Sequence, residues 1–263
     1  MATLVVDCGG LGLKAAIFDD AGLQVGDRTR RDTPYPLSPL KLADTIAELG
    51  ASSDLKITQV TVGMPGMIRH GKVIHTPHYI TTSGPHSAID PDLAEQWANC
   101  DIQSLLAARL GVPTIVMNDA ELHGLGVITG QGSELVLTFG TGLGTAWFDE
   151  GALAPHLEIS HAPVRIGEMV LGRGRRTSLT YDRYIGDKEL RRLGADHWSD
   201  RVLAVVDSLR PVFHWDRLFI GGGNAQRIAP WAKSRLADDV IIVPNEAALT
   251  GGLKVWNSVT PDS

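Results

Sequence analysis

Cysteine is scarce in this sequence, and its scarcity excludes several kinds of site. The 263-residue chain has only two cysteines, Cys8 and Cys100. They form neither a CxxC pair nor a zinc-ligand spacing, so the sequence offers no thiolate metal cluster. A disulfide between the two stays open, but reduced thiols fit better with a cytoplasmic chain.

Long apolar runs and an excess of basic residues are also missing. No stretch approaches the roughly 20 apolar residues that a membrane helix needs. The first ten residues, MATLVVDCGG, show neither the basic nor the apolar region of a signal peptide. The formal net charge is −6, and this acidic balance argues against a protein that coats DNA or RNA. We therefore expect a cytoplasmic protein with no membrane or nucleic-acid partner.

The amino-terminal part predicts short strands joined by turns. Residues 3–7, 13–18 and 23–25 read as three strands, with glycines at 9, 10 and 12 and an acidic turn at 19–22 between them. A dinucleotide-binding domain would place a helix directly after its glycines, so that fold is excluded. Helices at 42–49 and 94–110 and strands at 60–62 and 114–117 complete a mixed α/β pattern.

The opening pattern then recurs. Residues 135–139, a GTGLG turn at 140–144, residues 145–148 and an acidic turn at 149–151 repeat the order strand, glycine turn, strand, turn. A repeated order of features indicates two halves built on one plan. A helix at 200–210, a strand at 217–220 followed by three glycines, and a helix near 246–255 are expected in the second half.

Three glycine-rich turns thus follow strands, at residues 9–12, 140–144 and 221–223. Glycine lets backbone amides converge on phosphate oxygens, although any one such turn is more often a simple tight turn. Three such turns, two of them at matching places in the two halves, favour phosphate binding. No GxxxxGK[ST] motif is present, so a Walker-type phosphate loop is excluded.

Together these motifs resemble the ROK family of repressors and sugar kinases, within the actin, hexokinase and Hsp70 superfamily. The resemblance is strongest to the branch that contains polyphosphate glucokinases. It covers nearly the whole chain and depends on residues 7–14, 63–66, 118–120, 137–144, 158–161, 220–224 and 245–252. It implies an α/β fold of two ribonuclease H-like (actin-like ATPase) domains with an interdomain cleft. We place these domains at 1–117 and 118–245, with a last helix at about 246–257 that packs back on the first.

The resemblance also implies a reaction, in which a phosphoryl group passes from ATP or inorganic polyphosphate to the 6-hydroxyl of glucose or a related hexose, with Mg²⁺ and in a homodimer. Asp119 is the candidate general base, because a positioned carboxylate can accept the hydroxyl proton. Its position also suits a plain helix N-cap. The expected hexose-binding residues are Gly66, Asn118, Glu158 and His161. Without the resemblance, Glu158 and His161 would be an unremarkable polar pair on a loop.

The resemblance assigns the glycine turns to the phosphates and the nucleotide. The residues concerned are Asp7, Gly9, Gly10, Gly12, Lys14, Gly140, Thr141, Gly142, Gly144, Gly221, Gly222 and Gly223. Asp7 is expected to hold Mg²⁺ directly or through water. Lys14 is expected to reach the transferred phosphoryl group, or else to be a solvent-facing lysine on an edge strand.

Two departures from the family pattern affect these expectations. Leu11 stands where the family usually has threonine, which removes a hydroxyl beside the phosphate. Many family members carry zinc near the histidine that matches His161, completed by downstream cysteines. Here no cysteine follows Cys100, so we expect no zinc site.

Some readings remain as alternatives. The arginines at 173, 175, 176, 191 and 192 are expected at a solvated surface, or on the path of a polyanion. The histidines at 70, 75, 78 and 86 share no ligand spacing and are expected at the surface or in the cleft. A catalytically degenerate sugar-binding protein, with Leu11 as the lesion, competes with the kinase. A regulator is disfavoured, because the chain starts at the first strand and leaves no room for a DNA-binding helix-turn-helix.

Overall fold

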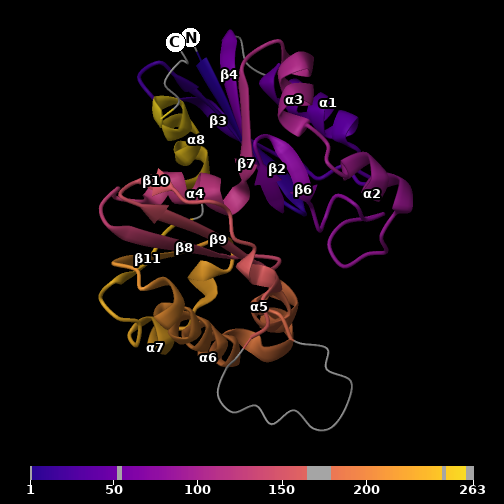
Figure 1. Ribbon diagram of the computed structural model, residues 1–263. Helices are drawn as coiled ribbons and strands as arrows, with labels where there is room; N and C mark the ends of the chain where they lie inside the picture. Colours follow the sequence, from indigo (N-terminus) through magenta and orange to yellow (C-terminus); the bar gives the residue numbers. More distant parts are fainter. Residues whose placement is uncertain (1, 52–54, 165–178, 245–246, 259–263) are drawn as a thin grey trace. The chain divides into compact units, whose positions relative to one another are not determined.

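A computed structural model describes residues 2–51, 55–164, 179–244 and 247–258 (Figure 1). The chain forms two compact units, residues 1–126 with 246–263, and residues 127–245. The boundary lies later than the expected 117/118, because α4 (Asp119–Val127) packs within the first unit. A Cβ on Gly126 of α4 would lie 2.0 Å from the Ala247 carbonyl oxygen of the last helix, so the two helices are in direct contact.

The first unit is built on a five-stranded sheet with the order β3-β2-β1-β4-β7. Strands β1 (Ala2–Cys8), β2 (Gly12–Asp19) and β3 (Gln24–Asp32) are antiparallel neighbours, as the predicted meander requires. Strands β4 (Ile57–Met64) and β7 (Thr114–Asn118) continue the sheet in parallel with β1. A small hairpin of β5 (Met67–Arg69) and β6 (Lys72–His75) follows β4.

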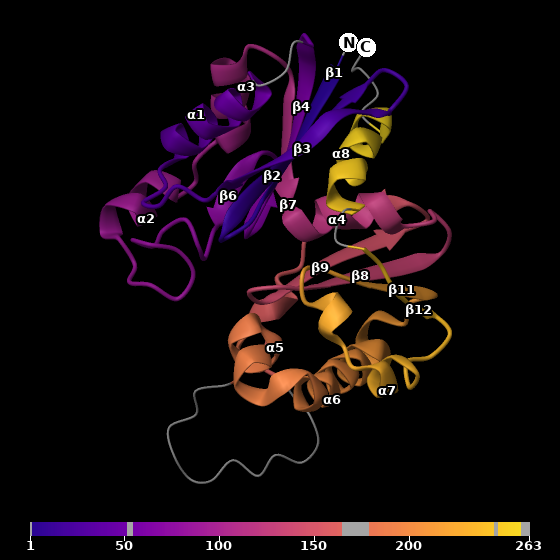
Figure 2. The ribbon, with the colours of Figure 1, turned by 180° about the vertical axis from the view of Figure 1, so that it is seen from behind.

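Helices cover both faces of this sheet (Figures 1 and 2). One face packs against α1 (Pro39–Gly50), α2 (Pro91–Trp97) and α3 (Ile102–Leu110), and Leu4 and Val6 of β1 belong to this core. The single helix expected at 94–110 is wrong. The chain breaks between α2 and α3, where Asn99 has a positive φ and the Asp101 side chain caps α3 by accepting from the Ser104 amide.

The last helix, α8 (Ala247–Ser258), contacts β1 and β4 of the first unit (Figure 2). Its glycines allow a close approach, because a Cβ on Gly252 would lie 2.3 Å from a Val5 methyl group. The Thr61 hydroxyl donates to the Gly252 carbonyl at 2.8 Å and accepts from the Trp256 indole at 2.8 Å.

The second unit repeats the same plan. Its sheet has the order β10-β9-β8-β11-β12. Strands β8 (Ser133–Phe139), β9 (Leu143–Asp149) and β10 (Ala152–Leu153) are antiparallel, while β11 (Arg217–Gly221) and β12 (Val240–Ile242) run parallel to β8. This equivalence confirms the two halves that the repeated sequence pattern predicted.

Helices of the second unit bury one face of its sheet. These are the short α5 (Tyr181–Ile185), the long α6 (Asp187–Phe213) and the short α7 (Pro230–Lys233). Helix α6 is much longer than the expected 200–210 and kinks at Gly194, whose φ is 75°. Trp198 lies fully buried after the kink, donates to the Ile185 carbonyl at 2.7 Å and packs edge-on against Phe139. Short 3₁₀ turns occupy Ile159–His161 and Ala225–Arg227.

Candidate active site

The first glycine turn joins β1 to β2 and is held from outside by side chains. The Gly9 amide donates to the Gly12 carbonyl at 2.9 Å, which closes the turn. The Thr33 hydroxyl donates to the Gly9 carbonyl at 3.0 Å and the Tyr35 hydroxyl to the Gly10 carbonyl at 2.9 Å. Leu11 at the tip is 61% exposed and takes no part in the core. The turn is therefore rigid around a solvent-facing tip.

Asp7 and Lys14 lie opposite each other at the base of this turn. They are register partners of β1 and β2, and the Lys14 ammonium lies 3.5 Å from Asp7 Oδ2. Burial raises the pKa of Asp7, and Lys14 opposes that rise. Asp7 Oδ1 has no hydrogen-bond partner within the described part of the chain. A single carboxylate oxygen beside a phosphate-binding turn fits the donor set of Mg²⁺, which usually takes one or two carboxylates and completes its shell with phosphates and water.

Asn118 and Asp119 stand where β7 ends and α4 begins. Asn118 Oδ1 accepts from the Ala120 amide at 2.8 Å and the Glu121 amide at 3.4 Å, while Glu121 Oε2 accepts from the Asn118 amide at 3.0 Å. This is a capping box, with Asn118 as the N-cap and Glu121 three residues later. The N-cap role considered for Asp119 thus belongs to Asn118.

The Asp119 carboxylate lies at the first helical position of α4, where the helix dipole favours a negative charge. Burial, followed by the charges of Asp7 and Asp119, raises the pKa of Cys8. The same two carboxylates add to the effect of burial on Tyr79, whose pKa is also raised. Asp119 is thus close enough to the end of β1 to influence the groups beside Asp7.

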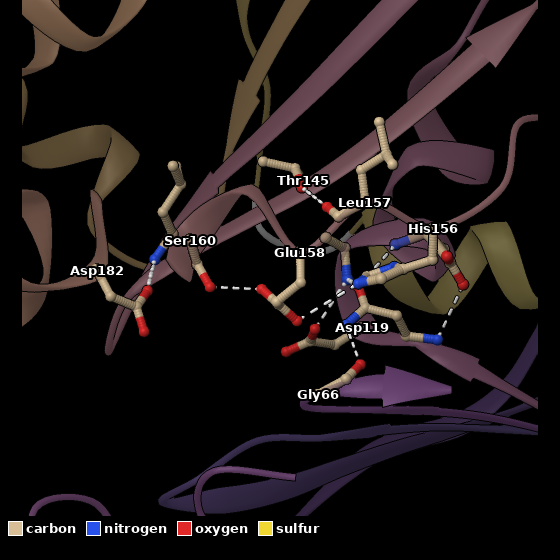
Figure 3. Close-up of polar contacts among 12 residues, drawn as sticks. Gly66, Asp119, Thr145, His156, Leu157, Glu158, Ser160 and Asp182 are labelled. Carbon is tan, nitrogen blue, oxygen red and sulfur yellow. Dashed lines mark hydrogen bonds and ion pairs between the residues drawn. The ribbon is translucent and has the colours of Figure 1, made fainter. Parts of the chain in front are cut away.

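Gly66, which is labelled in Figure 3, accepts a hydrogen bond from Asn118 through its carbonyl oxygen. The Asn118 side-chain amide donates to that carbonyl at 2.8 Å. Gly66 has a φ of 109°, and a Cβ there would lie 2.1 Å from the His75 carbonyl oxygen, so only glycine fits.

Two buried hydroxyls in the same unit were not anticipated from the sequence. Thr76 is 2% exposed and its backbone lies next to Gly66, while Tyr79 is fully buried. Neither hydroxyl has a hydrogen-bond partner among the described residues. Leaving a buried hydroxyl without a hydrogen-bond partner costs free energy. No spacing or motif marks these residues.

One of the four scattered histidines, His78, lies over the first glycine turn, with His75 and His86 near it. The His78 ring lies 3.0 Å from the position that a Cβ on Gly10 would take. Burial, then the charges of His86 and His75, lowers the pKa of His78 to about 4. His78 is half-buried, whereas His75 and His86 are exposed.

In the second unit, the second and third glycine turns lie side by side. The second turn joins β8 to β9, and its Gly140 carbonyl accepts from the Asn224 side chain at 3.0 Å. The Asn224 amide donates to the Phe139 carbonyl at 2.9 Å. Gly222, with a φ of 84°, would place a Cβ 2.5 Å from that same carbonyl oxygen. Asn224, the last residue of the motif at 220–224, therefore connects the two turns.

Asp182 of α5 occupies the other side of the second turn. Its carboxylate accepts from the Leu143 amide at 2.8 Å (Figure 3). A Cβ on Gly142 would lie 2.1 Å from the Asp182 carboxylate, so a larger residue here would displace that side chain. The amides of Leu143 and Gly140 are thereby engaged by the protein itself, since the Gly140 amide donates to the Gly142 carbonyl at 3.1 Å. The amides of Thr141 and Gly142 and the Thr141 hydroxyl are left as donors.

Glu158 lies in a polar group before the 3₁₀ turn that carries His161. The Ser160 hydroxyl donates to Glu158, and His156 Nε2 lies 3.4 Å from its carboxylate (Figure 3). Burial acts to raise the pKa of Glu158. Hydrogen bonds from His156 and Ser160, with the charges of His156 and His161, outweigh it and hold the pKa below its ordinary value. His156 and Ser160 were not anticipated from the sequence.

Of the five arginines considered for a polyanion path, two lie in the described part of the chain. Arg173, Arg175 and Arg176 lie outside the described residues. Arg191 and Arg192 form ion pairs on α6 with Asp187 and Glu189, at 2.7 and 2.6 Å, which fits a solvated surface.

The described ranges contain neither a cluster of metal-binding side chains nor a membrane-spanning helix. Within them, no group of three or more His, Cys, Asp or Glu side chains is placed to hold a metal ion. The helices of the same ranges include none with the length and apolar character needed to cross a membrane.

Comparisons with known proteins agree with this geometry. Polyphosphate glucokinase of Mycobacterium tuberculosis (strain ATCC 25177 / H37Ra) is 29% identical over 260 residues, covering 94% of this chain and 87% of the relative. Polyphosphate glucokinase of Mycobacterium leprae (strain TN) is 28% identical over 261 residues, covering 94% of this chain and 72% of the relative.

Solved structures show the same fold. The inorganic polyphosphate/ATP-glucomannokinase from Arthrobacter sp. strain KM superposes with a TM-score of 0.76 at 27% identity, covering 98% of this chain and 99% of that chain. A ROK family glucokinase from Streptomyces griseus, in complex with glucose and AMPPNP, gives 0.71 at 18% identity, covering 97% and 99%. The expected actin-like ATPase fold is thus confirmed.

The comparisons also show the family of the chain and support its enzyme class. The relatives support a phosphotransferase of the hexokinase and glucokinase type. The model of the ROK family matches residues 3–155, more than half of the sequence. The chain therefore belongs to the ROK family.

Proposed function

We propose that this protein transfers the terminal phosphoryl group of ATP or inorganic polyphosphate to the 6-hydroxyl of glucose or a related hexose. The observation that carries the proposal is the arrangement at the start of α4. Asn118 and Glu121 form the capping box, and Asp119 Oδ1 also accepts from the Ala120 amide at 3.0 Å. These contacts position the Asp119 carboxylate, which would serve as the general base.

Asp119 would accept the proton of the hexose hydroxyl as the hydroxyl oxygen forms its bond to phosphorus. The bond from phosphorus to the leaving phosphate oxygen breaks in the same event, and the leaving oxygen keeps the electron pair. Catalysis of this kind depends on positioning and on stabilising charge. The capping box supplies the positioning, because it fixes the backbone that carries Asp119.

The proposed hexose-binding residues are Gly66, Asn118, Glu158 and His161. Their polar groups would provide donors and acceptors for vicinal hydroxyls.

The phosphates are assigned to the glycine turns. In the first unit, the turn that contains Gly9, Gly10 and Gly12 would bind the transferred group together with Lys14, and Asp7 would hold Mg²⁺. When bound, Mg²⁺ supplies neutralisation of the phosphate charge. In the second unit, Thr141 with the amides of the second turn would bind the remaining phosphates. Gly221, Gly222 and Gly223 would lie near adenosine.

A degenerate sugar-binding protein is the second candidate, and Leu11 is the observation that favours it. Its side chain is apolar and 61% exposed at the tip of the phosphate-binding turn, where a hydroxyl would be useful. Turnover with a panel of hexoses, Mg²⁺ and either donor, measured by a coupled assay, separates the two candidates.

The role of Asp119 is tested with Asp119→Asn, which keeps the shape of the side chain but removes the base. We expect kcat to fall by about 10²–10⁴-fold while hexose affinity, measured by calorimetry, stays close to that of the wild type. Asp101→Asn is the matched control, because asparagine caps α3 as well as aspartate does. An Asp119→Asn variant that retains more than about a tenth of the wild-type rate would contradict the assignment. A homodimer is expected and is checked by light scattering of the same samples.

A further inference from the structure

A row of charged side chains crosses the first sheet beside its glycine turn. Asp7 of β1 is the register partner of Lys14 of β2, and Lys14 is the register partner of Arg30 of β3. Directly opposed residues of antiparallel strands point to the same face of a sheet. The three charges therefore share one face, with Arg30 at the edge strand, about 4.8 Å beyond Lys14.

The guanidinium of Arg30 lies against the glycine turn itself. Its Nε and Nη2 atoms are 3.5 and 3.8 Å from the position that a Cβ on Gly12 would occupy. Gly12 has no side chain, so the guanidinium rests on the backbone at the base of the turn. An extended arginine could instead have pointed along the solvent edge of β3.

The positive charge of Arg30 is also not paired with an acidic side chain of the described residues. Among the described residues Arg30 forms no ion pair, whereas Lys14 is paired with Asp7. Arg31, the next residue, points to the opposite face and pairs with Glu48 of α1. Asp32 shares the face of Arg30, but no ion pair joins the two in the described chain. Arg30 is thus an exposed, unneutralised cation placed at the turn.

We infer that Arg30 binds the phosphate chain of the phosphoryl donor, next to the group held by Lys14 and the turn. The inference rests on the proposed function and adds a subsite to it, for a linear run of phosphoanhydride-linked phosphates. Arginine suits this ligand, because its planar fork can hold two phosphate oxygens at once, whereas lysine acts as a point charge. ATP and inorganic polyphosphate share this chemistry.

A structural role makes a different prediction. Charged residues on edge strands protect against edge-to-edge aggregation, and Arg30 could serve only that purpose. In that case substitutions of Arg30 and Arg31 would have the same effect on phosphate binding, because both residues are exposed on β3.

The test compares Arg30→Gln with Arg31→Gln, which removes an equal charge from the opposite face of the same strand. Inorganic tripolyphosphate is titrated calorimetrically into each protein without hexose, so that no turnover is required. We expect Arg30→Gln to weaken binding about 10-fold, as fits the loss of a hydrogen bond to a charged group. Arg31→Gln should bind as the wild type does, and Arg30→Lys should recover part of the loss.

Steady-state kinetics identify the source of the phosphate chain. Arg30→Gln should raise the KM for the donor while kcat and the hexose KM stay near wild-type values. If the KM rises for polyphosphate and not for ATP, the ligand of Arg30 is the inorganic polyphosphate chain. If the KM rises for both donors, the two share the Arg30 subsite.

The outcomes also separate this inference from the proposed function. Arg30-dependent binding of tripolyphosphate by a wild type that phosphorylates no hexose would support the subsite and overturn the proposed function. Equal tripolyphosphate affinity in the Arg30→Gln and Arg31→Gln variants, or no binding by the wild type, would overturn the inference.

Discussion

His78 should make the stability of the protein depend on pH between about 4 and 6.5. Burial, with the charges of His86 and His75, lowers its pKa to about 4, while in the unfolded chain histidine titrates near 6.5. Within this window the unfolded chain binds more protons than the native one, so stability rises with pH. The contribution is complete above about pH 6.5 and is lost as the pH falls toward 4.

The size of the effect follows from the shift. One pKa unit corresponds to about 1.36 kcal/mol, so the native state should lose up to about 2 kcal/mol at pH 5 relative to pH 7.5 through this residue alone. Because His78 is only half-buried, water screens part of the effect, and we expect about 1 to 2 kcal/mol.

The measurement is urea unfolding at pH 5 and pH 7.5 for the wild type and His78→Asn. The wild type should lose about 1 to 2 kcal/mol more than the variant between the two values. His70→Asn is a suitable control, because His70 is exposed and has a φ of 50°, which asparagine tolerates. If His78→Asn and the wild type lose the same free energy of unfolding, the native imidazole is not kept neutral and the reasoning is wrong.

Two further predictions concern the departures from the family pattern. Leu11→Thr should raise the rate of phosphoryl transfer in the coupled assay, by less than the roughly 100-fold of a desolvated donor, because the tip is 61% exposed; a slower variant would contradict the placing of this turn against the phosphate. Purified protein should carry no stoichiometric zinc by elemental analysis, because no cysteine follows Cys100; one tightly held zinc per chain would show that the region of His161 has been misinterpreted.

Much of the fold could be predicted because its signals are local. Short apolar runs bounded by glycine and acidic turns predicted β1, β2 and β8, and the repeated order predicted the two units. The prediction of one helix at 94–110 is wrong, because the apolar spacing continues across the break between α2 and α3, where Asp101 caps α3. The N-x-x-E spacing of Asn118 and Glu121 was readable as a capping box, and it would have placed α4 correctly.

The site could be predicted only where a motif marked it. Thr76 and Tyr79 are ordinary residues in the sequence, and only their burial without partners distinguishes them. The grouping of His78 with His75 and His86 depends on how the chain after β6 folds back on the first glycine turn. Asn224 reaches the second turn because β11 pairs with β8, far away in sequence.

The packing of α8 has a consequence for how the protein is made. The first unit combines residues 1–126 with 246–263, so its opening strands leave the ribosome long before the helix that covers them. Until α8 arrives, Val5 and Thr61 lack the glycine face and the indole that contact them. The intervening second unit is contiguous in sequence and can fold as soon as it is synthesised. The half of the protein that is translated first is therefore the half that is completed last.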